Sequence, residues 1–216
     1  MIREITAHVY ERRVHPEGVD WFINTFLICL DEANVYIDSG LGSKAITDFM
    51  PYCDPKKPNI LIYTHAHFDH VWGSKGASFS KIIACEPFNT LLEEDFDRSY
   101  AYFKEIQEGE VGCVYADTLI DFKTQIGPLV LYPAPGHTQD GLMVHYPKEG
   151  LLFMGDNCAD HGKGIIPELE DLDAYKKTID LALSLESKTL LGSHCDELSS
   201  KALESIMKSL TSLHSV

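Results

Sequence analysis

Residues 59–73, NILIYTHAHFDHVWG, place His65, His67, Asp69 and His70 within six consecutive positions, directly after the strand-forming run NILIYT. In an extended segment, side chains two positions apart point the same way, so His65 and His67 can bind one metal ion together. Asp69 and His70 point elsewhere if they begin a helix or turn. One tetrahedral ion can hardly accept all four side chains from so short a loop. The spacing therefore predicts a second ion close to the first.

Other His and Asp residues follow strand-like runs in distant parts of the chain. His137 comes after LYPAPG, Asp156 after LLFMG and His194 after TLLGS, and Asp38 has the same kind of position after NVYI. A metal site needs donors from several segments, and these strand ends can supply them at one edge of a sandwich. Together with the first cluster, His137, Asp156 and His194 make seven donors. Two sets of three donors with one shared carboxylate predict a binuclear metal centre.

The pattern of apolar residues predicts an α/β fold. Runs rich in β-branched and aromatic residues predict strands at EITAHVY, WFINTFLICL, NVYIDSG, NILIYT, KIIACE, LVLYPAPGHT, GLMVHYP, LLFMGD and KTLLGSH. Apolar spacings of three and four predict helices over residues 91–106, around Tyr175 and Ile179, and from Leu203 to Leu213. A further short helix is predicted after a Ser43 cap, with Ile46, Phe49 and Met50 on one face. Two halves of strands followed by helices favour a four-layer αββα sandwich of two mixed β-sheets flanked by helices.

Composition limits the class of protein. A chain of 216 residues, 44% hydrophobic and 24% charged, is expected to fold as a single domain over residues 1–216. Its formal charge of −15 disfavours nucleic acid as a partner. No segment has the apolar length of a membrane span and the N-terminus lacks the pattern of a signal peptide, so we expect no membrane partner and a cytoplasmic location. The six cysteines stand singly and are expected to be reduced and mostly buried.

The H-x-H-x-D-H segment after a strand, with PGHT, GD and GSH downstream, resembles the metallo-β-lactamase superfamily of metal-dependent hydrolases. The resemblance implies the αββα fold with the site at one edge. It also implies that Asp38 orients the metal-binding loop without being a ligand. The implied ligands are His65, His67 and His137 for one ion and Asp69, His70 and His194 for the other, with Asp156 bridging both.

Asp156 indicates a branch within that superfamily. The β-lactamases themselves usually carry Cys or Ser at this position, whereas Asp is typical of the glyoxalase II and lactonase branches. The resemblance implies two divalent ions, zinc first with iron or manganese as alternatives, and a metal-bridging hydroxide that cleaves a thioester, lactone or other small ester. Asp69 is placed to take up and pass on the hydroxide proton. The expected partner is a small-molecule substrate, and a homo-oligomer is left open.

A second function stays open on the same residues. Persulfide dioxygenases of this fold carry a similar segment but bind one iron and consume oxygen; here His65, His67, His137 and Asp156 would hold that ion. Outside the ligand set, Cys158, Cys195 and Trp21 are interpreted as packing residues, and His15 as a weak candidate for substrate contact. His161 and Lys163 either line the pocket or face solvent. The aromatic stripe Phe96, Tyr100 and Phe103 of the helix over residues 91–106 is predicted to be core, with a lid or a subunit contact as the alternative role of that helix.

Overall fold

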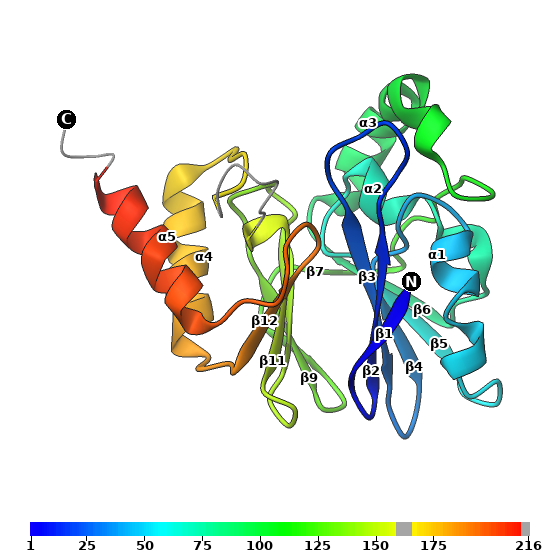
Figure 1. Ribbon diagram of the computed structural model, residues 1–216, viewed down its shortest axis with the longest axis horizontal. Coiled ribbons are helices and arrows are strands. Elements are labelled where there is room, and N and C mark those ends of the chain that lie inside the picture. Colours follow the sequence, from blue (N-terminus) through cyan, green and yellow to red (C-terminus); the bar gives the residue numbers. More distant parts are fainter. Residues whose placement is uncertain (159–165, 213–216) are drawn as a thin grey trace. The chain divides into compact units, whose positions relative to one another are not determined.

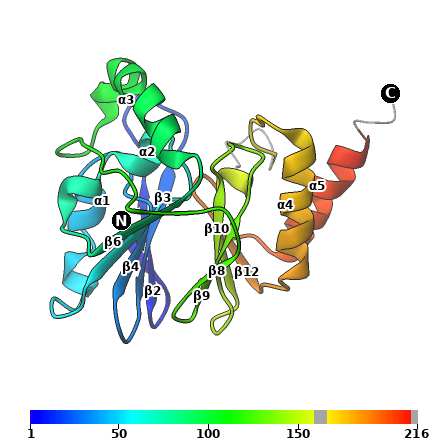
Figure 2. The same ribbon diagram turned by 180° about the vertical axis from the view of Figure 1, so that it is seen from behind.

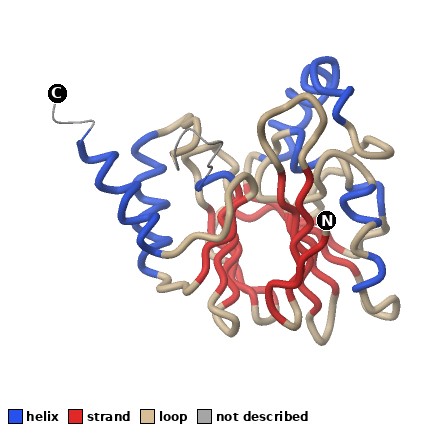
Figure 3. Tube along the Cα trace, in the orientation of Figure 1, coloured by secondary structure: helices blue, strands red, loops and turns tan. Residues whose placement is uncertain are grey.

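The computed structural model describes residues 1–158 and 166–212. The chain forms two compact units, Met1–Ile120 and Asp121–Val216. Each unit contains one mixed β-sheet and its own helices (Figure 3). His161, Lys163, Leu213 and His214 lie outside the described residues. Within the described part, no helix is long and apolar enough to cross a membrane.

Seven strands form the sheet of the first unit, in the same order in space as in the chain. The first four pair antiparallel as a meander, and β4 to β7 pair in parallel through helical crossovers. Because β4, β5 and β6 are parallel, their carboxyl ends lie at one edge of the sheet. The strands are β1 (Ile2–Thr6), β2 (Val9–Val14), β3 (Ile23–Cys29), β4 (Asn34–Ile37), β5 (Asn59–Ile62), β6 (Lys81–Cys85) and β7 (Thr118–Ile120).

One face of this sheet is covered by helices (Figure 1). They are α1 (Lys44–Thr47), α2 (Phe68–Val71) and α3 (Phe88–Phe103), with short 3-10 turns η1 (Met50–Tyr52), η2 (Ser74–Gly76) and η3 (Lys104–Ile106). Apolar side chains that alternate along the strands, such as Leu27, Tyr36 and Leu61, pack against Trp72 and Phe88 from the helical side. The buried apolar area between these layers holds the loops at the strand ends in place.

The second unit has a five-stranded sheet in the order β12-β11-β10-β9-β8. Its strands are β8 (Thr124–Ile126), β9 (Leu129–Pro133), β10 (Leu142–Tyr146), β11 (Leu151–Gly155) and β12 (Thr189–Gly192), with the turn η4 (Asp156–Cys158) after β11. The helices α4 (Leu172–Ser184) and α5 (Ser200–Ser212) lie side by side along one face of the sheet (Figure 2). Tyr175 and Ile179 of α4 and Leu203 of α5 are buried there against Leu152 and Met154 of β11.

Several predicted elements differ from the observed ones. The run EITAHVY contains the turn between β1 and β2, and the three-residue strands β7 and β8 were not predicted because they are too short to show a period. Ser43 does precede α1, but its side chain makes no cap hydrogen bond; Ser43 Oγ accepts one from Glu110 N at 3.0 Å instead. Ile46 and Phe49 are buried, but Met50 is 50% exposed, and α1 itself ends at Thr47 before both Phe49 and Met50.

The aromatic stripe of α3 differs more strongly from its prediction. Leu92 near the helix start is buried, but Tyr100 is 37% exposed and Phe103 is 40% exposed. The periodicity is that of a helix, but in its C-terminal half Tyr100 and Phe103 contact Trp72 and Phe68 at α2 and stay partly exposed. The prediction that the whole stripe is core is therefore wrong for its last two residues.

All six cysteines are free, as predicted. Cys85, Cys158 and Cys195 are buried, whereas the other three are only half-buried, so burial of most of them was over-predicted.

Candidate metal centre

Two parallel neighbouring strands bring Asp38 and Thr64 to one edge of the first unit. Ile37, the last residue of β4, pairs with Ile62, the last residue of β5, so the residues just beyond them are adjacent. Asp38 Oδ1 accepts a hydrogen bond from Thr64 N at 2.7 Å, and Asp38 Oδ2 accepts one from Thr64 Oγ1 at 2.8 Å. Asp38 is 1% exposed, so its carboxylate is a buried charge held by these donors.

His65 and His67 meet as the spacing predicted. His65 Nε2 lies 3.0 Å from His67 Nδ1. Two nitrogen ligands at about 2.1 Å from a tetrahedral ion are about 3.4 Å apart, so this pair has nearly the separation that one ion requires. Imidazole nitrogens are donors that suit Zn and Fe.

Asp69 and His70 lie in the short helix α2, and the ring of His70 packs against that of His65, with centroids 4.0 Å apart. His70 Nδ1 donates to Asp38 Oδ2 at 2.8 Å, because a carboxylate can only accept. The proton on Nδ1 leaves His70 Nε2 with its lone pair, 3.8 Å from Asp69 Oδ1. Metal-binding histidines are commonly oriented in this way by a hydrogen bond to the other ring nitrogen.

Thr64 orients His65 in the same manner. Its hydroxyl gives its one proton to Asp38, so it accepts from His65 Nδ1, which lies 3.1 Å away. The lone pair of His65 is then on Nε2, the atom that faces His67. The backbone of α2 is fastened to the loop after β4, where Ser39 N donates to His70 O at 2.7 Å. One buried carboxylate therefore sets the ring orientation of two candidate ligands.

Three strand ends bring His137, Asp156 and His194 together in the second unit. β9 and β11 are both antiparallel to β10, so they run in the same direction, and β12 is parallel to β11. The carboxyl ends of all three strands therefore lie at one edge of the sheet. Asp156 Oδ2 is 3.5 Å from His137 Nε2 and 3.4 Å from His194 Nε2. The Asp156 carboxylate thus lies close to both histidines, as expected of a ligand shared between two ions.

A backbone carbonyl orients His137. His137 Nδ1 donates to Glu168 O at 2.7 Å, which again leaves the lone pair on Nε2, the atom facing Asp156. The preceding Gly136 has φ +147, and a Cβ there would lie 2.5 Å from Tyr175 Cα of α4. A residue with a side chain would push this loop away from α4, so Gly136 is needed for the close approach that places His137.

The structure thus places the seven predicted donors in two groups, four in the first unit and three in the second. Three residues that the sequence reasoning did not single out contribute to them: Thr64, Glu168 and Tyr175. Thr64 had a signal, because it is a polar residue at the end of a buried strand directly before the donors. Glu168 acts through its carbonyl and had none. Tyr175 Oη donates to Asn157 O at 2.7 Å and so fastens the turn that carries Asp156 to α4.

The described part of the chain also contains the residues considered outside the ligand set, apart from His161 and Lys163. Trp21 packs edge-on against Phe68, with ring centroids 6.4 Å apart, and His15 is exposed beside Phe22. Cys158 and Cys195 are buried with their sulfurs 3.7 Å apart. The hydrogen bond with Cys195, together with burial, raises the pKa of the Cys158 thiol well above its ordinary value. His145 lies buried on β10, where desolvation and then the charge of Lys123 lower its pKa.

Comparison with known proteins gives one family match. The model of the metallo-β-lactamase superfamily matches residues 18–83, which include the H-x-H-x-D-H segment. A metallo-β-lactamase type 2 of Pseudomonas aeruginosa is 37% identical over 143 residues, 63% of this chain and 52% of that protein. A lactamase-like protein of Emericella nidulans is 28% identical over 160 residues, 72% of this chain and 45% of that protein. The chain thus spans about half the length of these relatives.

A third relative carries a more specific name. It is an atrochrysone carboxyl ACP thioesterase of Paecilomyces divaricatus, 26% identical over 160 residues, which are 72% of this chain and 45% of that protein.

Solved structures show the fold. A metallo-β-lactamase from Erythrobacter litoralis superposes with a TM-score of 0.76 at 20% identity, covering 98% of this chain and 96% of the other. The mono-zinc form of the FIM-1 metallo-β-lactamase from Pseudomonas aeruginosa gives 0.75 at 19% identity, covering 100% and 96%. The predicted fold class is confirmed: two mixed β-sheets flanked by helices, as in the metallo-β-lactamase α/β sandwich.

Proposed function

Because the chain carries a domain of the metallo-β-lactamase superfamily, we propose that it is a metal-dependent hydrolase that uses two divalent ions to cleave a thioester, lactone or other small ester. The superfamily includes hydrolases. The observation that carries the proposal is the convergence of donors within each unit: His65 Nε2 3.0 Å from His67 Nδ1, and Asp156 Oδ2 within 3.5 Å of two histidine nitrogens.

The proposal assigns the two groups of donors to one binuclear centre. Asp156 is the shared donor because it is the one carboxylate of the second group and faces both of that group's histidines. The complete set is His65, His67 and His137 on the first ion, Asp69, His70 and His194 on the second, and Asp156 on both.

Two divalent ions held by these residues would supply Lewis-acid polarisation of a carbonyl and a water of lowered pKa. The residues of the chain would orient the ligands and move protons. Asp38 and the Glu168 carbonyl accept from Nδ1 of His70 and His137, which directs Nε2 of each ring to the centre. Asp69, 6% exposed beside His70, would accept the proton of that water and pass it on. The raised pKa of Cys158 disfavours a thiolate nucleophile.

The names of the relatives suggest which bonds to test. A thioesterase among them favours a thioester, while the metallo-β-lactamase type 2 makes a β-lactam the competing substrate. Zinc is the first metal to test, since the FIM-1 structure is named as a mono-zinc form. We take the partner to be a small molecule in either case.

The deciding experiment is metal analysis of protein purified without added metal, combined with hydrolysis assays on a thioester, a lactone and a β-lactam. The variant is Asp156→Ala, and the matched control is Asp173→Ala, whose carboxylate is 84% exposed in the same unit. We expect about two ions per chain and thioester or lactone hydrolysis in the wild type and control. In Asp156→Ala we expect both the bound ions and the hydrolytic activity to be lost.

Other outcomes separate the alternatives. One iron per chain, with oxygen uptake on a persulfide and no hydrolysis, would show a dioxygenase and overturn the hydrolase proposal while leaving the ligand set standing. Hydrolysis of the β-lactam alone would contradict the proposed ester or thioester substrate. Full hydrolysis in Asp156→Ala would remove Asp156 from the centre.

A further inference from the structure

A cavity of about 310 Å³ lies beside His67 within the first unit. Its lining combines His67 and Phe68 at the start of α2 with residues near the end of α3, including Tyr102 and Phe103. This volume is at the lower end of the range of small-molecule pockets, about 300–1,000 Å³. We call it the α3 pocket; it borders a candidate metal ligand directly.

Aromatic rings form one wall of the α3 pocket. Phe68 and Phe103 stack with ring centroids 4.3 Å apart and planes 3° from parallel. Phe68 also contacts Trp72, at 5.0 Å between centroids, so the pair is supported from the core. Tyr102, which also lines the pocket, is 76% exposed. Large aromatic side chains left exposed next to a candidate catalytic centre indicate a binding surface.

The polar wall of the pocket is neutral as a whole. The guanidinium of Arg98 donates to Asp95 Oδ1, with Nε at 3.0 Å. The hydroxyl of Ser99 donates to Asp95 Oδ2. The carboxylate of Asp95 thus accepts hydrogen bonds from two neighbouring residues of α3, and it pairs with the charge of Arg98. A pocket with paired charges and flat rings favours an uncharged planar group over an ion.

We propose that the α3 pocket binds a planar aromatic group on the acyl side of the substrate, and that it thereby sets substrate choice. The inference rests on the proposed hydrolase function. In that function the scissile carbonyl would lie at the metal centre, and His67 belongs both to that centre and to the lining of the pocket. Tyr102 and Phe103 contact the ring, and neither takes part in the chemical step. A linear alkyl acyl group gains no stacking there and is the poorer substrate.

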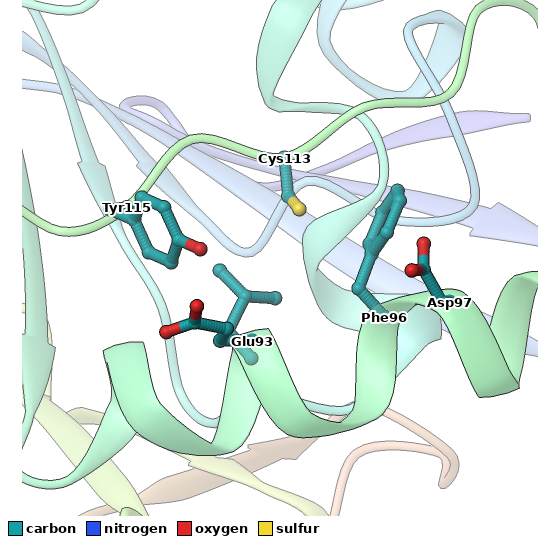
Figure 4. Close-up of a pocket in the computed structure, with 6 residues that line it drawn as sticks. Glu93, Phe96, Asp97, Cys113 and Tyr115 are labelled. Atoms are coloured by element: carbon teal, nitrogen blue, oxygen red, sulfur yellow. The ribbon is translucent and has the colours of Figure 1, made fainter.

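A second cavity on α3 provides the control position. It measures about 240 Å³ and is lined by a different set of α3 residues, Glu93, Phe96 and Asp97, together with Cys113 and Tyr115 from the segment after the helix (Figure 4). None of the described residues that line it is a candidate metal ligand. Burial raises the pKa of the Cys113 thiol to about 11, so this cavity offers no thiolate. Tyr115 is 53% exposed and resembles Tyr102 in type and exposure.

The test compares two thioesters that share N-acetylcysteamine as the leaving group, one phenylacetyl and one hexanoyl. The wild type is measured beside Tyr102→Ala, Phe103→Leu and the control Tyr115→Ala, with thermal unfolding confirming that each variant is folded. We expect kcat/KM for the phenylacetyl thioester to fall about threefold to tenfold in the first two variants. The hexanoyl thioester should change by less than about twofold in them, and the control should leave both unchanged.

Equal losses of kcat/KM on both thioesters, or no loss on either, would overturn the proposal that the α3 pocket binds an aromatic group. So would dissociation of a dimer in Tyr102→Ala by size-exclusion chromatography, because a second copy would then cover these rings.

Failure of the hydrolase proposal is recognised separately, as no hydrolysis of either thioester by the metal-loaded wild type. Binding of the corresponding phenyl and hexyl thioethers, followed by ¹⁵N NMR, then tests the pocket proposal independently of hydrolysis. Shifts at Tyr102 and Phe103 with the phenyl compound, weakened in Tyr102→Ala, support it. The absence of such shifts overturns it.

Discussion

Asp38 shows how one residue positions ligands from two segments. Its φ of +61 is a left-handed conformation that is unusual for a residue with a side chain. Three hydrogen bonds hold it there, from Thr64 N, Thr64 Oγ1 and His70 Nδ1. The strained backbone aims both carboxylate oxygens at groups that carry candidate ligands, so the strain is compensated by the orientation of the site.

We therefore predict that Asp38→Asn lowers metal affinity about tenfold to a hundredfold. The amide has one acceptor oxygen, and its NH₂ group must face a donor, either Thr64 or the Nδ1–H of His70. Competition with a chromophoric chelator measures the affinity. Asp31→Asn, an exposed turn position in the same unit, is the control. Unchanged affinity in Asp38→Asn would show that Asp38 does not orient the donors.

At the scale of elements, α4 supports the donors of the second unit. The side chain of Asp171 caps this helix by accepting from Ala174 N at 2.9 Å. Asp171 N also donates to Gly136 O at 3.1 Å, next to His137. From the same helix, Tyr175 is hydrogen-bonded to Asn157 O beside Asp156. The start of α4 thus fixes two of the three loops that carry donors.

We predict that Asp171→Ala lowers the free energy of unfolding by about 1 kcal/mol, the usual cost of removing an N-cap side chain. Urea denaturation measures this change. Asp173→Ala should change stability by less than about 0.5 kcal/mol, because that residue is 84% exposed and its contact with Lys176 at 3.9 Å is screened. An equal effect of both variants would mean that general charge at the helix start, rather than the cap bond, is responsible.

The elements also show the limits of periodicity. The spacing of Leu92, Phe96, Tyr100 and Phe103 predicted a helix, and α3 is one. The stripe of Phe96, Tyr100 and Phe103 was predicted to be core, which fails at Tyr100 and Phe103. A helical period states which residues share a face, whereas burial depends on what lies opposite that face.

At the scale of the whole molecule, each unit has a hydrophobic core of its own. The single domain over residues 1–216 stays a prediction. If the proposed centre takes donors from both units, bound metal must link their stabilities. The two tryptophans, Trp21 and Trp72, both lie in the first unit, so their fluorescence reports on that unit alone.

We predict that metal at a hundredfold excess over Kd stabilises the wild type by about 2.7 kcal/mol per ion, seen as a higher tryptophan unfolding temperature than in chelator. In the double variant His137→Ala/His194→Ala, which changes only the second unit, most of this shift should disappear. Asp173→Ala should retain it. A full shift in the double variant would show that the first unit binds metal without the second.

The sequence by itself was enough to predict the candidate donors and to locate the ends of the strands that carry them. The spacing of His65 and His67 was sufficient because the direction of side chains along an extended segment depends only on local geometry. The positions of Asp38, His137, Asp156 and His194 were predictable because buried strands show as apolar runs and the polar residue that ends each run stands out.

Only the tertiary structure decided how those donors are oriented and what surrounds them. The carbonyl of Glu168 orients His137 from 31 positions away in the chain, and every residue has a carbonyl, so no side chain marks it. Thr64 and Asp38 meet because β4 and β5 are parallel neighbours in register, a pairing that apolar runs do not specify. The exposure of Tyr102 and Phe103 depends on where α3 ends relative to its sheet. These features arise from contacts between distant segments, which local patterns do not encode.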